Sequence, residues 1–380
     1  MTGSPHGRRS AYRSAGIDYD ALDAGKRGAL SEALQTSKLL ALMGGRAIDE
    51  SRGEPAFVFE LEGRTLSFVV EGLGTKSIIA RQVEEQLGIN AFDNVAYDAV
   101  AAIVNDLCCV GALPLVVNAY FATGSAAWYE QPARHAGLLA GWREGCVDAG
   151  ATWGGGESPT LPELIKPAEL ELAGSAVGVI PEGTSPILGA GLEVGDEIVL
   201  VQSAGLHANG ASLARMIASQ LERGYQEPLP SGRAFGEALL DRSVIYVALV
   251  RELLHADIDV HYLSHITGHG LLKLMRPRRE LSYKVNHLPD VPEVLEFLVE
   301  QAGMSPAAAY STFNMGCGFA IYSAAGSGRE VVRLAAELGL SAHVAGTVGE
   351  GPRRVILEPI GVTYDSEALD LAPRHERRDE

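Results

Sequence analysis

The chain lacks the features that mark several large protein classes. Its longest strongly apolar runs, such as 99–104 and 113–117, fall well short of the roughly 20 residues that cross a bilayer. It has no basic block interleaved with aromatic residues, and its formal charge is −17, with 31 Lys and Arg against 48 Asp and Glu. These absences argue against a membrane protein and against nucleic acid as a partner, so we expect a soluble, cytoplasmic protein.

Cysteine is also scarce. The four residues Cys108, Cys109, Cys146 and Cys317 show no CxxC spacing, and two of them lie inside an apolar run with helical periodicity. We therefore expect small buried thiols rather than disulfides or metal ligands. The phosphate-binding pattern GxxxxGK[ST] is missing from the whole chain as well, so a nucleotide must be held in some other way.

The chain is long enough for two hydrophobic cores. It has 380 residues, and domains average roughly 150 residues. Three glycines and two prolines interrupt the periodicity over 181–191, which predicts a linker there. We place a first domain at 11–182 and a second at 190–360. Both halves mix helical and strand patterns, which predicts an α/β (α+β) fold without a repeat.

Local patterns predict most of the elements. Alternating apolar residues around Glu62 and Gly63 predict a β-hairpin. Helices are expected at 93–110, 132–149, 210–220, 244–256, 294–301 and 330–338. Strands are expected at 115–121, 171–180, 197–202, 281–285 and 318–322.

The first chemical motif is Glu71-Gly72-Leu73-Gly74-Thr75-Lys76, directly after the hairpin. Its glycines would let backbone N–H groups approach a phosphate, and Lys76 would supply a cation. An ordinary turn at the end of a strand is the alternative.

The second motif lies in the helix expected at 93–110. Asp98 and Asn105 are seven residues apart and share a helix face, with Asp106 beside them. Polar groups in an apolar helix need partners, which could be ligands or simply a satisfied helix end.

The third motif is a run of three glycines, Gly154, Gly155 and Gly156, followed by Glu157. We expect these glycines to form a turn. Consecutive glycines cost conformational entropy, so the backbone should pass close to something, and Glu157 would offer a carboxylate to a ligand. A flexible surface loop is the alternative.

The second half carries further candidates. Residues 203–210 (SAGLHANG) join a strand to a helix, whose N-terminus could receive an anion while His207 donates or accepts a proton. A surface histidine is the alternative. Thr267 and Gly268 precede another expected helix, and Asn314 precedes a late strand. His261, His265 and His269 are spaced by four, but glycines 268 and 270 argue against a zinc-binding helix.

Taken together, these segments resemble the motif set of the phosphoribosylformylglycinamidine cyclo-ligase family, the ATP-dependent aminoimidazole ribonucleotide synthetases. Seven motifs occur in the family's order over about residues 11–358: AGIDYD at 15–20, EGLGTK at 71–76, VNDL at 104–107, GGE at 155–157, GLHANG at 205–210, TGHG at 267–270 and TFNMG at 312–316.

The resemblance implies a two-domain fold of aminoimidazole ribonucleotide synthetase type. The N-terminal domain would bind ATP and join a partner's strands in a dimeric β-barrel, and a C-terminal α/β domain would pack on it. It also implies conversion of formylglycinamidine ribonucleotide to aminoimidazole ribonucleotide, ADP and phosphate, with ATP and Mg²⁺ as cofactors and a homodimer as the assembly.

The resemblance also implies residue roles. His207, Lys76 and Asp106 would be catalytic, and Glu71, Asp106 and Glu157 would hold the metal. ATP and phosphate would be bound by Gly74, Thr75, Lys76, Asp98, Asn105, Gly154, Gly155 and Gly156. The substrate side would comprise Lys26, Asp20, Asn209, Thr267, Gly268 and Asn314.

The sequence departs from the family pattern in three places. Glu71 stands where an aspartate is usual, His269 interrupts the TGGG turn, and residues 158–164 differ from the usual TAEMPGxY segment. Two alternatives therefore remain open: a paralogue that phosphorylates another amide or small acceptor, and a catalytically inactive dimer that binds nucleotide. Selenophosphate synthetase is disfavoured because no N-terminal cysteine is present, and thiamine-phosphate kinase does not account for GLHANG and TFNMG.

Overall fold

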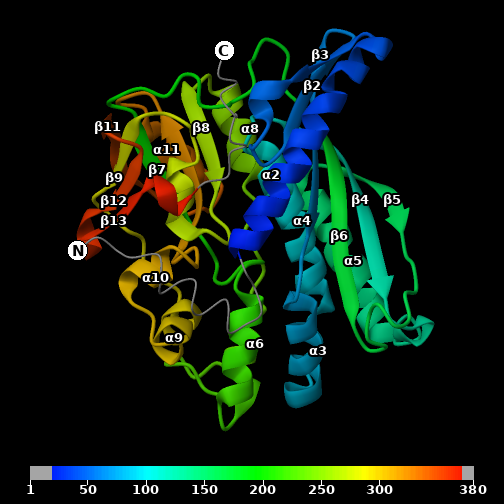
Figure 1. Ribbon diagram of the computed structural model, residues 1–380. Helices are drawn as coiled ribbons and strands as arrows, with labels where there is room; N and C mark the ends of the chain where they lie inside the picture. The colour runs from blue at the N-terminus through cyan, green and yellow to red at the C-terminus, as the bar shows by residue number, and fades with distance from the viewer. Residues whose placement is uncertain (1–18, 370–380) are drawn as a thin grey trace.

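The computed structural model describes residues 19–369, which form two β-sheets flanked by helices (Figure 1). The first sheet has six strands in the order β1-β2-β3-β6-β4-β5. Its strands are β1 (Gly45–Ile48), β2 (Phe57–Leu61), β3 (Arg64–Gly72), β4 (Leu113–Thr123), β5 (Thr152–Glu157) and β6 (Leu170–Val179). All neighbours pair antiparallel except β4 and β5.

The first half of the chain begins with α2 and also contains α3, α4 and α5. Their bounds are α2 (Tyr19–Thr36), α3 (Lys76–Leu87), α4 (Phe92–Cys108) and α5 (Pro132–Ala149). Strand β6 alternates strictly between buried and half-buried residues, as expected when one face of a sheet is covered by helices. The sheet is open in the described chain, with β1 and β5 at its edges. The expected dimeric β-barrel would need a partner's strands and stays a prediction.

The second sheet has seven strands in the order β13-β12-β9-β11-β7-β10-β8. They are β7 (Glu197–Gln202), β8 (Val260–His265), β9 (Leu281–Val285), β10 (Cys317–Ser323), β11 (Ala342–Glu350), β12 (Arg354–Leu357) and β13 (Val362–Asp365). The helices of this half are α6 (Ala211–Gln220), α7 (Phe235–Leu239), α8 (Val247–His255), α9 (Glu293–Gln301), α10 (Pro306–Tyr310) and α11 (Gly328–Glu337).

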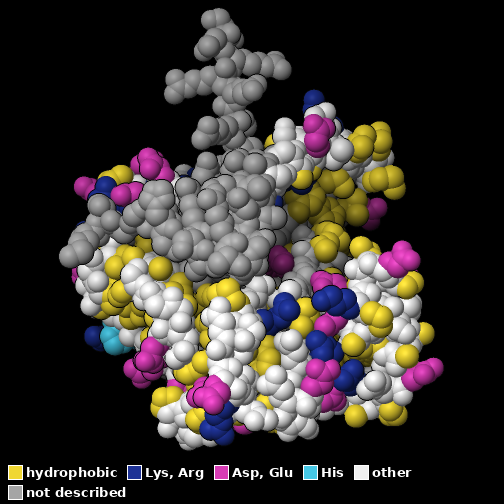
Figure 2. Space-filling view, turned by 60° about the horizontal axis from the view of Figure 1, so that its bottom comes forward, with side chains coloured by type: hydrophobic (Ala, Val, Ile, Leu, Met, Phe, Trp, Pro, Cys, Tyr) yellow, Lys and Arg dark blue, Asp and Glu magenta, His cyan; other side chains and the backbone are white. Residues whose placement is uncertain are grey.

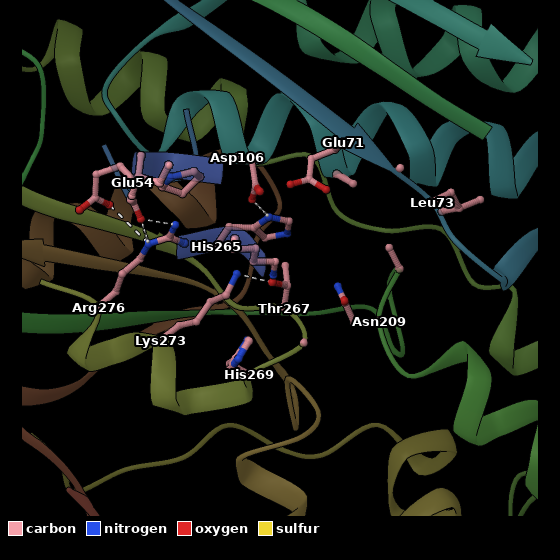
Figure 3. A pocket seen from close by; sticks show the side chains of 18 residues that line it. Glu54, Glu71, Leu73, Asp106, Asn209, His265, Thr267, His269, Lys273 and Arg276 are labelled. Atoms are coloured by element: carbon pink, nitrogen blue, oxygen red, sulfur yellow. Dashed lines mark hydrogen bonds and ion pairs between the residues drawn. The ribbon is translucent and has the colours of Figure 1, made fainter. Parts of the chain in front are cut away.

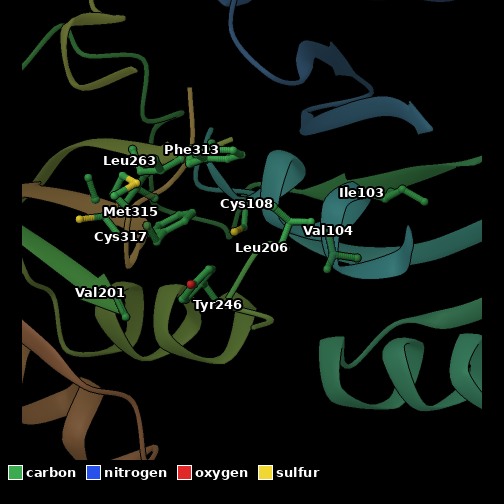
Figure 4. Close-up of a cluster of buried hydrophobic side chains, with 14 of the residues drawn as sticks. Ile103, Val104, Cys108, Val201, Leu206, Tyr246, Leu263, Phe313, Met315 and Cys317 are labelled. Atoms are coloured by element: carbon green, nitrogen blue, oxygen red, sulfur yellow. The ribbon is translucent and has the colours of Figure 1, made fainter. Parts of the chain in front are cut away.

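One hydrophobic core runs through both halves. Helix α4 contributes Ile103, Val104 and Cys108 to it; Ile103 packs toward Gly174 on β6, and Cys108 lies on the side of the helix that faces the second half (Figure 4). All four cysteines are free and buried, as expected. No helix in the described part of the chain is both long and apolar enough to span a membrane.

The expected glycine-rich turn at 154–156 is in fact strand β5, and this expectation was wrong. A Cβ on Gly154 would lie 2.5 Å from Val116 Cγ1, and one on Gly156 would lie 2.1 Å from the backbone oxygen of Ala119. Gly155 has φ +120° at a register shift of the β4–β5 pair. These glycines therefore permit a close, irregular pairing of two strands.

The helix expected at 244–256 begins only at Val247, because the residues before it are held by α4. Asp98 Oδ1 accepts a hydrogen bond from Ser243 N at 2.6 Å. Asn105 Oδ1 accepts from Tyr246 N at 2.9 Å, and Asn105 Nδ2 donates to Val244 O at 2.8 Å. Residues 240–246 thus do not add a further turn to the helix, because their backbone groups bond side chains of the other half of the chain.

Candidate functional site

A cavity of about 450 Å³ lies where the end of β3, the last turn of α4 and the loops of the second half meet (Figure 3). Glu71 reaches it from β3 and Asp106 from α4. The second half contributes Asn209 from the loop before α6 and Thr267 from the loop after β8. The full lining comprises Lys26, Leu30, Gly53, Glu54, Pro55, Glu71, Gly72, Leu73, Ala102, Asp106, Ala208, Asn209, His265, Thr267, Gly268, His269, Lys273 and Arg276.

Two carboxyl groups face one another in this cavity and differ in protonation. Burial, followed by the charge of Asp106 and a hydrogen bond to it, raises the pKa of Glu71 to about 8. Burial would also raise the pKa of Asp106, but the hydrogen bond and charge of His265, with Lys273 and Arg276, outweigh it and hold that pKa below its usual range. Asp106 is therefore the charged member of the pair at neutral pH.

His265 fixes the position of the Asp106 carboxylate. Its Nδ1 lies 2.6 Å from Asp106 Oδ1, and both side chains are almost fully buried. His265 ends strand β8, so the contact joins the two halves of the chain at the wall of the cavity.

Lys273 brings a cation to the same cavity. It lies on the 3₁₀ segment Gly270–Met275, is 7% exposed, and donates a hydrogen bond from Nζ to Thr267 Oγ1. Burial lowers its pKa, while the charge of Asp106 opposes that shift. Lys273 and Thr267 together offer donors to an anion beside the carboxyl pair.

The cavity is much less acidic than the chain as a whole. Glu54, Glu71 and Asp106 are matched by three cations, Lys26, Lys273 and Arg276. The chain carries −17 overall, and on the face drawn in Figure 2 Lys and Arg stand beside Asp and Glu rather than in one broad basic patch. A locally balanced cavity is suited to a polyanion that arrives with a divalent cation.

Lys76 and Asp98, which were predicted to bind phosphate, do not line this cavity. The two side chains form a fully buried ion pair, with Lys76 Nζ 2.5 Å from Asp98 Oδ2, and neither lines the cavity. Asn105 is also fully buried, and its side chain bonds residues 244 and 246. In this structure these polar side chains bond other residues of the same chain.

His207 and Asn314 are likewise buried behind the cavity. His207 Nε2 accepts a hydrogen bond from Ala204 N at 3.2 Å, and burial holds the pKa of His207 well below its usual value. Asn314 Oδ1 accepts from Ser203 Oγ at 2.8 Å, and its Nδ2 donates to Gly205 O at 2.8 Å. Both side chains bond the segment that contains the GLHANG motif, and neither lines the cavity, so their roles toward a ligand stay predictions.

Gly154, Gly155, Gly156 and Glu157 lie outside this cavity. Glu157 faces Tyr120, which faces Ala173, which faces Gly72, so Glu157 is three strands away from β3. At about 4.8 Å per strand the separation is roughly 14 Å. Within one chain Glu157 is therefore not a third carboxylate for the Glu71–Asp106 pair.

The remaining predicted site residues either lie near the cavity or fall outside the part of the chain that the structure describes. Lys26, Asn209, Thr267 and Gly268 line it. Gly74 and Thr75 follow the lining residues of β3, and Thr75 Oγ1 lies 3.1 Å from Ser212 Oγ on α6. Asp20 is on α2, but its side chain is outside the described residues, as is most of the motif at 15–20.

Comparison with known proteins identifies the family. Residues 53–180 match the AIR synthase related protein N-terminal domain, and residues 193–358 match the corresponding C-terminal domain. The chain is 31% identical to phosphoribosylformylglycinamidine cyclo-ligase of Methanothermobacter thermautotrophicus, over 91% of this chain and 96% of that protein. The enzyme of the same name from Carboxydothermus hydrogenoformans is 32% identical, over 91% and 98%. The chain belongs to the phosphoribosylformylglycinamidine cyclo-ligase family.

Solved structures support the fold of this family member. The hydrogenase maturation protein HypE in complex with ATP has a TM-score of 0.55 at 16% identity, covering 79% of this chain and 83% of that one. Thiamine monophosphate kinase from Aquifex aeolicus has a TM-score of 0.52 at 16% identity, covering 80% and 90%. At such low identity the likeness concerns the two-domain α/β fold alone.

Three charged residues of the cavity were absent from the sequence analysis, Glu54, Lys273 and Arg276, and His265 was considered there only as a zinc ligand. His265 and Lys273 flank the TGHG turn closely, so their proximity to that motif was the available signal. Glu54 and Arg276 carried no signal, because they meet only in the folded chain, where Arg276 Nη2 donates to Gly53 O at 2.7 Å.

Proposed function

We propose that this protein is an ATP-dependent cyclo-ligase that converts formylglycinamidine ribonucleotide to aminoimidazole ribonucleotide, ADP and phosphate in purine synthesis. One observation carries the proposal. Four family motifs, EGLGTK, VNDL, GLHANG and TGHG, each contribute residues to a single cavity: Glu71, Asp106, Asn209 and Thr267. Curated relatives at 31% and 32% identity over nearly the whole chain bear the name of this enzyme.

The reaction has two bond-making steps. The formamide oxygen of the substrate attacks the γ-phosphorus of ATP, and the bond from that phosphorus to the bridging oxygen of ADP breaks. The N1 nitrogen then attacks the activated formyl carbon, loses a proton, and expels inorganic phosphate as the imidazole ring closes. The protein's part is to align these groups in line and to balance the charge that moves.

Magnesium fits the carboxyl pair. Burial, followed by the charge of Asp106, raises the pKa of Glu71 to about 8, and a divalent cation held by the two carboxyl groups would favour the charged form of Glu71. No group of three or more His, Cys, Asp or Glu side chains is arranged for a metal among residues 19–369. Mg²⁺ commonly binds one or two carboxylates, and nucleotide phosphates and water complete its shell. When bound, it neutralises triphosphate charge.

The remaining cavity residues suit the phosphates and the amide. Lys273 Nζ and Thr267 Oγ1 are close enough to bond one another, so both can bind one phosphoryl oxygen. In this proposal Lys273 takes the cationic role that the sequence suggested for Lys76. His265 keeps Asp106 charged and oriented, Asn209 offers amide groups to the substrate, and Lys26 approaches the cavity from α2.

The deciding experiment measures ATP turnover with and without formylglycinamidine ribonucleotide. A cyclo-ligase releases ADP and phosphate only with that substrate and forms aminoimidazole ribonucleotide in equal amount. ATP binding with no substrate-dependent turnover would identify a nucleotide-binding dimer instead. Turnover with another amide and none with formylglycinamidine ribonucleotide would identify a paralogue, which the departures at Glu71 and His269 make worth testing.

We also propose that the protein acts as a homodimer whose first domain spans 11–182 and whose second spans 190–360. Phe68 and Val70 on β3 are 41% and 63% exposed, and Leu115 on β4 is 44% exposed. Phe68 and Val70 point to the same face of the open sheet because they are two residues apart. A second copy that covers this face would bury these side chains.

A further inference from the structure

The loop at 203–210 brings two residues to the cavity and buries a third. Ala208 and Asn209 line the cavity, and Figure 3 shows the side chain of Asn209 there. His207, directly before them, does not line it and is 4% exposed. The buried imidazole therefore has its contacts inside the protein.

The backbone of His207 is strained. Its φ is +57°, in the left-handed region, which is uncommon for a residue other than glycine. Such strain persists only where the surrounding structure holds the backbone in place. Asn209 follows two residues later, so the conformation at His207 helps to set the direction in which the chain reaches the cavity.

The imidazole ring of His207 supplies contacts that hold this turn. Its Nε2 accepts hydrogen bonds from Ala204 N at 3.2 Å and from Val244 N at 3.5 Å. Ala204 belongs to the same loop. Val244 lies in the segment 240–246, where its carbonyl oxygen accepts from Asn105 Nδ2 at 2.8 Å. One ring nitrogen thus ties the loop to the segment that α4 holds.

These two donors decide the protonation of the ring. A backbone N–H can only donate, so Nε2 carries no proton and the proton of the neutral ring is on Nδ1. Burial, followed by the charges of His265 and Lys76, lowers the pKa of His207 well below its usual value. Nδ1 is buried and bonds no other described residue. The ring is therefore a neutral acceptor for backbone groups, and it is not placed to exchange a proton with a substrate in the cavity.

Asn314 holds the part of the loop that precedes His207. Its side chain is buried, and its Nδ2 donates to Gly205 O at 2.8 Å and to Leu206 O at 3.4 Å. Two buried side chains thus fix the loop up to His207, and the two residues that follow are those that line the cavity.

We propose that His207 is a positioning residue, whose ring fixes the loop at 203–210 in the conformation that presents Asn209 to the amide of the substrate. The inference rests on the proposed function, in which Asn209 offers its amide groups to that substrate. Loss of the ring nitrogen would leave two backbone N–H groups unpaired and would release the strained turn, so Asn209 would no longer be held in one place. The ring does this without giving or taking a proton.

The test compares wild type with His207→Leu, His207→Gln and a matched control, His255→Gln, at the exposed end of α8. Leucine offers no acceptor, whereas the amide oxygen of glutamine can take the place of Nε2 but cannot exchange a proton. We expect His207→Leu to raise the KM for formylglycinamidine ribonucleotide about tenfold or more with little change in kcat. His207→Gln should recover most of that loss and guards against misfolding of the leucine variant. The affinity for Mg-ATP should be the same in all four proteins.

A double variant shows whether His207 acts through Asn209. Two residues that work as a unit give effects that do not add. If the ring serves to hold Asn209, His207→Leu should raise KM strongly in the wild-type background and only slightly in the Asn209→Ala background.

Two results would overturn the positioning role. One is an equal rise of KM in both backgrounds, which would mean that His207 acts independently of Asn209. The other is a loss of about a hundredfold or more in kcat for His207→Gln at unchanged KM, which would assign proton transfer to His207. Failure of the proposed function gives a different result, because wild type would then not turn over formylglycinamidine ribonucleotide, and that result would overturn both.

Discussion

At the scale of single residues, the facing carboxyl groups of Glu71 and Asp106 are the most unusual pair in the cavity. One is held charged by His265, and the other is kept neutral up to a pH of about 8 by burial and by its charged neighbour. The same pair that suits a divalent cation therefore costs free energy when the cation is absent.

This cost predicts a pH dependence of stability in the presence of a chelator. The folded pKa of Glu71, about 8, exceeds the ordinary value of 4.5, so the folded state binds more protons between those values. Its contribution is fully present below pH 4.5 and is lost as pH rises towards 8. Urea unfolding of Glu71→Gln should show a free energy of unfolding that exceeds wild type at pH 8.5, by a few kcal/mol at most, but not at pH 5. Glu182→Gln in the exposed linker is the control. A wild type whose stability falls no more steeply than that of Glu71→Gln over this range would contradict the assignment.

Asp106 gives the matching prediction for the metal. Asp106→Asn preserves shape but removes one anionic ligand from a cation that prefers charged oxygen, so ATP affinity in the presence of Mg²⁺ should fall about tenfold or more. ATP affinity measured in excess chelator should change much less. If calorimetry gives the same Mg-ATP affinity for variant and wild type, Asp106 is not a metal ligand.

At the scale of elements, helix α4 shows what the polar residues in an apolar segment contact in the folded chain. Asp98 and Asn105 bond the segment 240–246 of the second half, and Asn94 Nδ2 donates to Leu240 O at 3.0 Å. Lys76 at the start of α3 neutralises Asp98. The polar face of α4 is thus an interdomain contact, and Asp106 beside it lines the cavity together with Ala102.

The ion pair between α3 and α4 yields a stability prediction. Lys76→Met leaves Asp98 as an uncompensated buried charge, which costs about 3–5 kcal/mol. The melting temperature should fall sharply, and the double variant Lys76→Met/Asp98→Leu should recover part of the loss. Lys284→Met on the exposed side of β9 serves as control. A Lys76→Met protein with wild-type melting and lost ATP binding would restore the catalytic role.

The sequence predicted the secondary structure elements better than it predicted which elements and side chains contact one another. The hairpin β2–β3 and helices α4 and α5 were predicted because their periodicity is local. Strand β5 was not, because its glycines serve pairing with β4, which a local pattern does not contain. In the cavity, Glu71, Asp106 and Thr267 were predicted from motifs. Lys273 and Arg276 were missed because only the packing of their segment against the first half brings them there.

At the scale of the whole molecule, the open first sheet carries exposed apolar side chains on one of its faces. Phe68 and Val70 stand on it as large exposed apolar side chains, although the chain has ample charged residues for its surface. Exposed apolar groups gathered on one sheet face are typical of an interface.

The dimer proposal is tested by introducing charged side chains on this surface. Phe68→Lys and Val70→Lys should convert a dimer to a monomer at micromolar concentration, since each would bury an unpaired ammonium group at the interface. Light scattering measures the mass. Leu338→Lys replaces an apolar side chain that is 40% exposed beyond α11 and should leave the mass unchanged. A wild-type protein that is monomeric in the same assay would contradict the proposal.

The bonds between α4 and residues 240–246 also predict how slowly two backbone amide hydrogens exchange with solvent. The amides of Ser243 and Tyr246 are donors to side chains of the other half of the chain, so neither can open by local fraying of its own element. Their hydrogen–deuterium exchange should proceed only at the rate of unfolding of the entire molecule, alongside the amides of the central strands. Earlier exchange at these two amides, while strand β7 stays protected, would mean that the halves separate before they unfold.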